Sequence, residues 1–359
     1  MTIARKAALY VLGVFFASSH AFSAEVENLT VQNTSLSEYV CSVWTAQDGL
    51  PGNTVTDLIQ GKNGYIYIGT YEGLVRFDGI EFKLINHVLD EKYAFSSARS
   101  IFEDSKNNIW VGANDEGAVC IGKNGLTKSF TVNDGLPNNS VRSITEDRDG
   151  NIWIGTAGGI AYITPSGIIK RPSGLEKFGA SEITVIQLYC DTAGRIWLTS
   201  ADEGGLYYYN NGTFDRYASF ETLENPAILC VTQDKNGGFW FGASPHYAIY
   251  KNGTEEYLYD VGSGDQPGTV VNVIRVDKEG GVWFGRDTGI TVYKNGQMKT
   301  YDKTTELASN NANTILEDAE GNMWFGTDRG GLKKFSPGKF IYHCGHGAVA
   351  FRTEHLCFC

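Results

Sequence analysis

The segment Asp147-Arg148-Asp149-Gly150-Asn151-Ile152-Trp153-Ile154-Gly155-Thr156 decides the fold, because close variants of it recur along the whole chain. Each copy has an aromatic residue, then an aliphatic residue or phenylalanine, and then usually glycine and a small residue. The aromatic positions are Tyr67, Trp110, Trp153, Trp197, Trp240, Trp283 and Trp324. Their spacings of 43, 43, 44, 43, 43 and 41 residues are too regular for chance. The chain is therefore built from seven copies of one unit.

Each unit predicts four short strands. In the third unit, strands over 141–146 and 151–155 flank the turn Asp147–Gly150, and strands over 160–163 and 168–170 follow. Aspartate can accept a hydrogen bond from the backbone two residues on, and glycine takes the left-handed conformation that closes such a turn. Four strands in about 40–45 residues are typical of one β-propeller blade. The predicted fold is all-β, a seven-bladed propeller with four antiparallel strands in each blade.

The two ends of the repeat region predict how the ring closes. An outer strand over 38–44 leads into Asp48-Gly49-Leu50-Pro51, and the same four residue types follow the outer strand around Phe130. The N-terminal strand is thus an outer strand without a blade of its own. We expect it to complete the last blade beside residues 331–335, which removes exposed sheet edges. The propeller domain then covers residues 39–337.

Composition agrees with many short strands and excludes other classes. The 359 residues include 43 glycines, 8 prolines and 45 aromatic residues, which excludes collagen-like and proline-rich disordered chains. The net charge is −11 and lysine and arginine do not cluster, so no nucleic-acid partner is expected. No cofactor or metal is expected either, because the aspartate turns lack the remaining ligands of a calcium loop.

Both termini lie outside the repeat. Arg5 and Lys6 precede an apolar run over 7–17 and small residues up to Ala24, a pattern typical of a cleaved signal peptide over 1–24. Because the apolar run is too short to span a bilayer, we expect a periplasmic or otherwise extracytoplasmic protein. Residues 338–359 fit no blade, so an irregular tail is expected there, either native or a truncated or frame-altered end.

At this point the chain resembles the two-component regulator propeller family of bacterial sensors. The resemblance rests on Trp44 and the Asp48–Pro51 motif, on Gly64–Thr70 with Glu72–Gly79, and on Glu317–Thr327. It implies an extracytoplasmic ligand sensor without catalytic chemistry. It also implies a membrane-bound histidine kinase or diguanylate cyclase output in the full-length protein. The oligomeric state stays open between monomer and dimer.

The loop after each Trp-x-Gly-Thr motif varies most between units, so it is the expected ligand-binding surface. We expect a pocket for a small molecule or an oligosaccharide there, biased towards units four and five, whose loops are longest. Carboxylates accept hydrogen bonds from hydroxyls, arginines bind anions, and aromatic rings stack. The expected lining residues are Asp202, Glu203, His246 and Tyr247, with Asp115, Glu116, Arg286, Asp287, Asp328 and Arg329 as outer candidates.

Two other functions are compatible with the sequence. The repeat also resembles that of the streptogramin lyases, for which a catalytic histidine–glutamate pair is expected; His246 and Glu203 are the candidates here. A propeller that binds another protein is the third possibility, but it favours large apolar loops, and these loops are polar.

Overall fold

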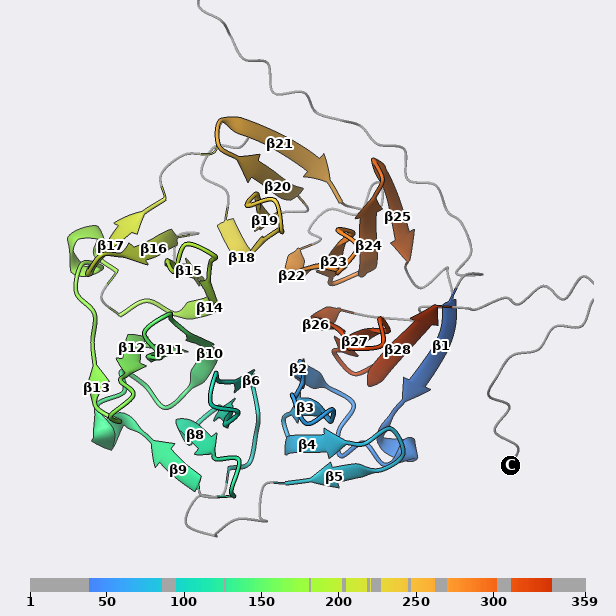
Figure 1. The fold of residues 1–359 in the computed structure, drawn as a ribbon, viewed down its shortest axis with the longest axis horizontal. Coiled ribbons are helices and arrows are strands. Elements are labelled where there is room, and N and C mark those ends of the chain that lie inside the picture. The colour runs from blue at the N-terminus through green and yellow to red at the C-terminus, as the bar shows by residue number, and fades with distance from the viewer. Residues whose placement is uncertain are drawn as a thin grey trace, which may run out of the picture.

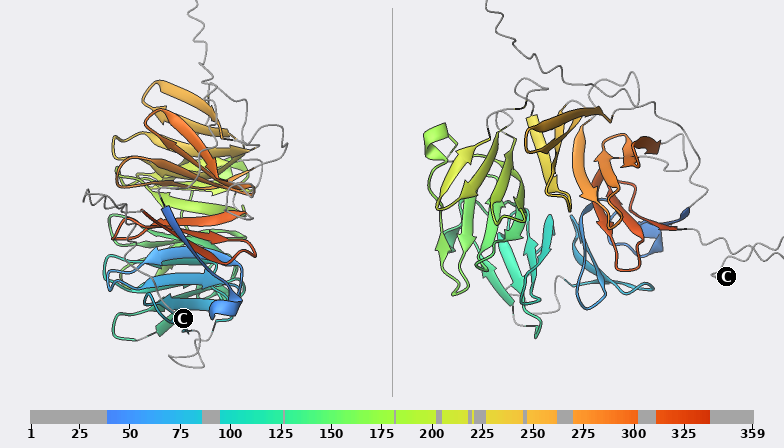
Figure 2. Two further views of the ribbon diagram at one scale, coloured as in Figure 1. Left: turned by 90° about the vertical axis from the view of Figure 1, so that its right-hand side faces the viewer. Right: turned by 45° about the horizontal axis from the view of Figure 1, so that its top comes forward.

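The computed structural model describes residues 39–337 except 86–94, 126, 181, 202–204, 218–219, 221–226, 245–246, 262–269 and 302–310. These residues form seven four-stranded antiparallel sheets arranged as blades around a central opening (Figure 1). Seen from the edge, the blades make up a disc (Figure 2, left). The predicted seven-bladed propeller is confirmed. No helix in the described part of the chain is both long and apolar enough to cross a membrane.

In blades one to six, the strands run from the inner to the outer edge in chain order. Blade one comprises β2 (Val55–Gln60), β3 (Ile66–Thr70), β4 (Gly73–Phe77) and β5 (Phe82–Leu84). Blade two comprises β6 (Ser100–Glu103), β7 (Ile109–Gly112), β8 (Ala118–Ile121) and β9 (Thr127–Phe130). Blade three comprises β10 (Val141–Glu146), β11 (Ile152–Thr156), β12 (Gly159–Ile163) and β13 (Ile169–Lys170). Blade four comprises β14 (Val185–Cys190), β15 (Ile196–Ser200), β16 (Leu206–Asn210) and β17 (Thr213–Arg216). Blade five comprises β18 (Ala227–Gln233), β19 (Phe239–Ser244), β20 (Tyr247–Asn252) and β21 (Glu255–Asp260). Blade six comprises β22 (Val271–Val276), β23 (Val282–Arg286), β24 (Gly289–Lys294) and β25 (Gln297–Tyr301).

Blade seven is built from both ends of the propeller. Its inner strands are β26 (Ala312–Glu317), β27 (Met323–Thr327) and β28 (Leu332–Pro337), and its outer strand is β1 (Tyr39–Trp44). β1 pairs antiparallel with β28, from Tyr39 opposite Pro337 to Trp44 opposite Leu332. The Trp44 ring stacks on Trp324 at a centroid distance of 5.5 Å. The expected closure of the ring by the N-terminal strand is confirmed.

The second strand of each blade carries the core because neighbouring blades cover both of its faces. All five residues of β11 are buried, and the same holds for β3, β15, β23 and β27. This explains why the Ile-Trp-Ile runs are continuously apolar instead of alternating. Burying these strands from water supplies most of the driving force for packing one blade on the next.

The aspartate turn is anchored by the blade tryptophan. In blade three, the Asp147 carboxylate accepts hydrogen bonds from the Asn151 backbone, from the Asn151 side chain and from Trp153 Nε1, the last at 2.7 Å. Asp104 does the same for Trp110 although its turn contains no glycine, because Asn107 adopts the left-handed conformation with φ 66°. Asparagine tolerates this conformation better than other non-glycine residues.

The Asp-Gly-Leu-Pro motif forms a capped turn on the way into a blade. The short helix η1 (Ala46–Asp48) is capped by Thr45, whose backbone N–H donates to Asp48 at 2.8 Å, and Gly49 ends it with φ 94°. The second motif repeats this geometry in η3 (Val132–Asp134). A third short helix, η4 (Glu176–Phe178), enters blade four. The leucines of both motifs, Leu50 and Leu136, are buried between blades.

Candidate functional site

The variable loops and the Asp-Gly-Leu-Pro connections lie on the same face of the disc. The Gly117 N–H donates to the Asn139 carbonyl at 2.9 Å, and the Gly331 N–H donates to the Asn53 carbonyl at 2.8 Å. Each bond joins the loop between the second and third strands of one blade to the connection that enters the next blade. We call this side the loop face, and the side with the aspartate turns the turn face.

The residues expected to line the centre of the pocket are described only in part. Asp202, Glu203 and His246 lie outside the described residues. Tyr247 begins β20 opposite Ala243 and is half-buried against the apolar cluster around Phe241. Its ring therefore belongs partly to the packing between blades four and five.

The outer candidates on blades two and seven have polar neighbours within the protein. Asp115 is exposed, and the Glu116 carboxylate accepts a hydrogen bond from Ser96 Oγ at 2.5 Å. Asp328 accepts from Thr54 Oγ1 at 3.2 Å, which joins blade seven to blade one. The Arg329 side chain is 86% exposed and lies 3.8 Å from Asp328, a distance at which a surface ion pair contributes little to stability.

In blade six the expected ligand-binding residue Arg286 is not open to a ligand. Arg286 is fully buried, and its guanidinium donates to Thr288 Oγ1 at 3.0 Å. The adjacent Asp287 is half-buried and accepts from the Val270 N–H at 3.2 Å. Arg286 is consequently inside the blade packing, whereas the sequence placed it among residues open to a ligand.

A second set of residues, not singled out from the sequence, lines the inner edge of the ring near the loop face. In every blade except the second, the innermost strand contains a β-bulge near its start. The bulged residue is the second residue of the strand, or the third in β18. In blade two, Arg99 takes the equivalent place just before β6. Figure 1 shows these innermost strands around the central opening. We call this set the bulge ring; its members are Thr56, Arg99, Arg142, Ile186, Leu229, Asn272 and Asn313.

The bulge is part of the scaffold because it recurs, but its side chains differ from blade to blade. Thr56 Oγ1 donates to the Ala98 carbonyl, and Asn313 Nδ2 donates to the Val55 carbonyl at 3.0 Å. Both therefore fasten one blade to the next. The side chains of Ile186 and Leu229 offer no hydrogen-bonding group. Within the bulge ring, only Arg99 and Arg142 carry a charge.

Arg99 and Arg142 form a positively charged pair without a carboxylate partner. Among the described residues, neither lies within ion-pair distance of an acidic side chain, and Arg142 Nε is buried without a hydrogen-bond partner. The Arg99 guanidinium donates to Asn114 Oδ1 at 3.3 Å. Burial lowers the pKa of Arg142, the charge of Arg99 lowers it further, and Tyr71 opposes both effects. Tyr71, which is 52% exposed, lies near enough to Arg142 to interact with its charge.

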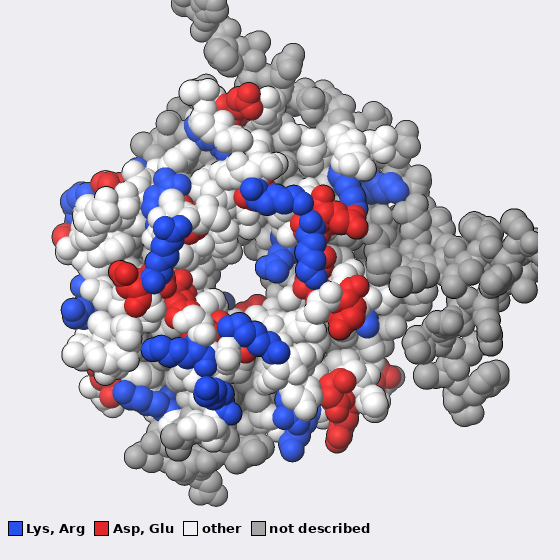
Figure 3. Space-filling model, in the orientation of Figure 1, with Lys and Arg blue, Asp and Glu red and all other residues white. Residues whose placement is uncertain are grey.

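This pair was missed although the sequence holds a signal for it. Every member of the bulge ring stands 11 residues before the aromatic anchor of its blade. Comparing that position across the seven units isolates the two arginines, but only the structure shows that the position lines the inner edge. Charged side chains also surround the central opening on the turn face, which is the face seen in Figure 3. No group of residues suited to hold a metal ion occurs in the described part of the chain.

Comparison with known proteins confirms the resemblance to the two component regulator propeller. Its family model matches four segments, residues 49–72, 92–115, 135–158 and 306–329. Each segment runs from the connection that enters a blade to the variable loop, and so includes the innermost strand and the aromatic anchor. No curated protein sequence matches the chain.

Solved structures share the fold at low sequence identity. The extracellular domain of a putative hybrid two component system from B. thetaiotaomicron is 20% identical with a TM-score of 0.70, over 85% of this chain and 43% of that chain. A streptogramin B lyase is 17% identical with a TM-score of 0.68, over 85% of this chain and 99% of that chain. The virginiamycin B lyase from Staphylococcus aureus, crystallised with quinupristin, is 14% identical with a TM-score of 0.66, over 83% of this chain and 99% of that chain. The chain thus spans less than half of that extracellular domain and nearly all of each lyase.

Proposed function

We propose that this propeller is the extracytoplasmic sensor domain of a bacterial signal-transduction protein and binds an anionic small molecule or acidic oligosaccharide on its loop face. The observation that carries the proposal is the pair Arg99 and Arg142, which meets no carboxylate in the described part of the chain. A half-buried guanidinium without a partner destabilises a protein, so its presence favours a ligand that completes it. A carboxylate or sulfate matches the fork geometry of arginine.

The regulator propeller match supports a binding role over a catalytic one. In this proposal the chemistry of signalling belongs to a membrane-bound output, and the propeller supplies recognition. Asp202, Glu203, His246 and Tyr247 on blades four and five, together with Asp115, Glu116, Arg286, Asp287, Asp328 and Arg329, remain candidates for the rest of the ligand contact. Export is tested by expressing the full chain in a Gram-negative host and sequencing the N-terminus of the periplasmic product, which should begin within residues 22–25.

Ligand binding is tested by calorimetric titration and thermal shift with sulfate, citrate and digalacturonate. We expect at least one of these anions to bind, and Arg142→Gln to weaken its binding at least tenfold. The same variant should melt at a higher temperature than the wild type without ligand, because it removes a charge repelled by Arg99. A merely structural arginine would instead lower the melting temperature on removal.

Arg275→Gln is the matched control, because Arg275 is exposed on the innermost strand of blade six and lies outside the bulge ring. It should leave both binding and melting temperature unchanged. Absence of binding by all three anions up to about 10 mM, or equal effects of the two variants, contradicts the proposed site.

A lyase is the second candidate, because the chain spans nearly all of two lyase structures. The residues proposed for that chemistry are Glu203 and His246. Incubation with quinupristin, followed by liquid chromatography, tests this function. Consumption of quinupristin by the wild type, but not by His246→Ala, supports the lyase and contradicts a purely sensory role.

A further inference from the structure

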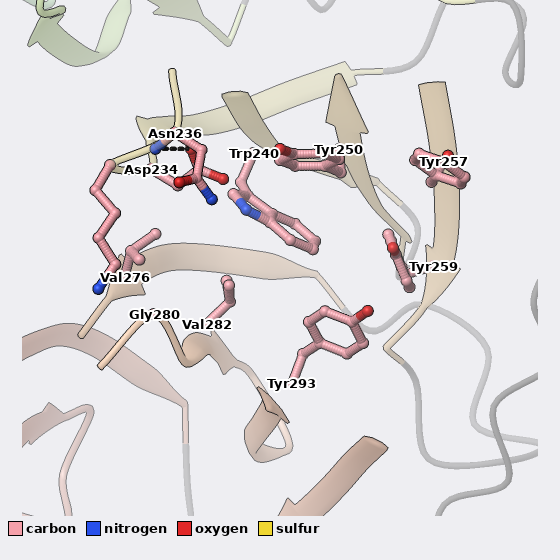
Figure 4. A pocket seen from close by; sticks show the side chains of 11 residues that line it. Asp234, Asn236, Trp240, Tyr250, Tyr257, Tyr259, Val276, Gly280, Val282 and Tyr293 are labelled. Atoms are coloured by element: carbon pink, nitrogen blue, oxygen red, sulfur yellow. Dashed lines mark hydrogen bonds between the residues drawn. The ribbon is translucent and has the colours of Figure 1, made fainter. Parts of the chain in front are cut away.

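An aromatic pocket lies between blades five and six, on the turn face and thus opposite the site proposed above. Its volume is about 220 Å³. The aspartate turn of blade five forms one wall, and rings from both blades form the others (Figure 4). The lining residues used below are Asp234, Asn236, Trp240, Tyr250, Tyr259 and Tyr293.

The repeat provides an internal comparison for this pocket. In five blades the indole Nε1 of the anchor tryptophan donates to the turn aspartate at 2.7–2.9 Å. Among the described residues, Trp240 is the one anchor tryptophan that lacks this bond, although blade five keeps its turn aspartate, Asp234. Figure 4 shows the Trp240 nitrogen on the side of the pocket formed by Asp234 and Asn236.

Two residues close to Asp234 and Trp240, Gly238 and Tyr250, set blade five apart within the repeat. Blades two, three and seven carry an asparagine four residues after the aspartate, and its side chain donates to the carboxylate. Blade five has Gly238 there, and a Cβ on it would lie 2.2 Å from the Tyr250 hydroxyl. Burial raises the pKa of Tyr250, and the charge of the Asp234 carboxylate raises it further. Blade six also has a glycine, Gly281, four residues after its turn aspartate, but Val292 and not a tyrosine lies opposite Trp283. The indole N–H of Trp283 keeps its hydrogen bond to Asp277.

The pocket therefore combines an indole donor, a carboxylate acceptor and tyrosine rings. The Trp240 ring lies 5.3 Å from Tyr259 and 5.7 Å from Tyr293, centroid to centroid, so the rings form one continuous apolar wall. A hydroxyl group both donates and accepts, and can satisfy Asp234 and Trp240 together. An organic ammonium ion also suits aromatic rings but has no acceptor for the indole N–H. The volume is below that of pockets for drug-sized ligands, which indicates a single small ring.

We propose that this pocket binds one pyranose unit of a carbohydrate, with a sugar hydroxyl placed between Trp240 Nε1 and the Asp234 carboxylate and the C–H face of the ring on the tyrosines. This is a second binding site, independent of the bulge ring. The turn aspartate of blade five is thus available to a ligand, whereas the turn aspartates of five other blades accept a hydrogen bond from their anchor tryptophan.

The test uses saturation-transfer NMR and calorimetry with the methyl pyranosides of glucose, galactose, mannose and xylose, and with tetramethylammonium. We expect at least one pyranoside to bind, and Trp240→Phe and Asp234→Asn each to weaken that binding at least tenfold. Trp240→Phe keeps a ring in the core while it removes the N–H.

Asp277→Asn in blade six is the matched control. It disturbs a turn aspartate that does hold its tryptophan, so it should lower the melting temperature more than Asp234→Asn and leave pyranoside binding unchanged. Binding of tetramethylammonium alone, no binding of any pyranoside, or equal loss in the blade six control overturns the proposal. Arg142→Gln should not alter pyranoside binding, which separates this site from the one on the loop face.

Discussion

Asp57 has a half-buried side chain whose titration should be visible in the stability of the whole propeller. It lies on β2, at the junction of blades one, two and seven. Its carboxylate accepts from the Ile101 N–H at 2.7 Å, from the Leu58 N–H at 2.8 Å and from Thr314 Oγ1 at 3.3 Å. Burial raises the pKa of Asp57 to about 6, and these hydrogen bonds only partly oppose the shift.

The sign and size of the effect follow from linkage. Because the folded pKa is about 6 and the ordinary value is 3.8, the folded protein binds the proton more tightly than the unfolded chain. Stability should therefore fall as the pH rises through this window, by about 3 kcal/mol in total. Between pH 4.5 and pH 7.5 the loss is about 2 kcal/mol, since the unfolded carboxyl is already mostly ionised at pH 4.5.

Asp57→Asn removes this titration and keeps the shape of the side chain. The amide retains one acceptor oxygen, so one backbone bond weakens at every pH, and the diagnostic quantity is the change with pH. The melting temperature of the variant minus that of the wild type should rise by roughly 4 °C from pH 4.5 to pH 7.5.

Scanning calorimetry or dye-monitored melting at both pH values measures this difference. Asp149→Asn is the control, because Asp149 is exposed in a turn and should show no such rise. If the difference stays constant, or falls, between the two pH values, the backbone hydrogen bonds outweigh burial and the reasoning is refuted.

Further predictions concern ring closure and the aspartate turns. Gly331→Ala should destabilise the propeller by more than about 1 kcal/mol, because Gly331 has φ 75° and a Cβ would lie 2.1 Å from the Trp44 carbonyl of the closing strand. Gly296→Ala, with a similar φ and open space, should cost less in the same urea titration. Burial alone would raise the pKa of Asp318, but hydrogen bonds from Trp324 and Asn322 outweigh it, and the pKa is lowered. The ionised Asp318 carboxylate therefore stabilises the fold above its unfolded pKa, and this contribution is lost in acid. The variant Asp318→Asn should unfold at a lower urea concentration than the wild type at pH 7, and it should lose less stability than the wild type below about pH 4. An acid dependence equal to that of the wild type would contradict this.

Much of this fold is determined by the sequence because its information is periodic. Seven aromatic anchors at near-constant spacing give the number of blades, and the doubly apolar strands around Trp153 show that both faces are covered. The N-terminal strand and its Asp-Gly-Leu-Pro motif reveal the closure, since the same motif follows an outer strand elsewhere. The sequence also predicts the aspartate turns through their Asp-x-x-Gly motif. The turn at Asp104 lacks this motif, because Asn107 replaces glycine as the residue with left-handed backbone conformation.

The sites depend on contacts between residues that the pattern does not bring together. The sequence marks Arg286 as a polar loop residue, but the packing of blade six buries it. Arg99 and Arg142, 43 residues apart, become a pair only because adjacent blades place their bulges side by side at the inner edge. Trp240 resembles every other anchor in the sequence, and only the structure shows that the turn aspartate of its blade accepts from the Asn236 and Gly238 backbone N–H groups and not from the indole. Repetition along the chain determines the scaffold, whereas the unsatisfied charge and the open indole donor arise where neighbouring strands and blades meet, and only the tertiary structure decides those contacts.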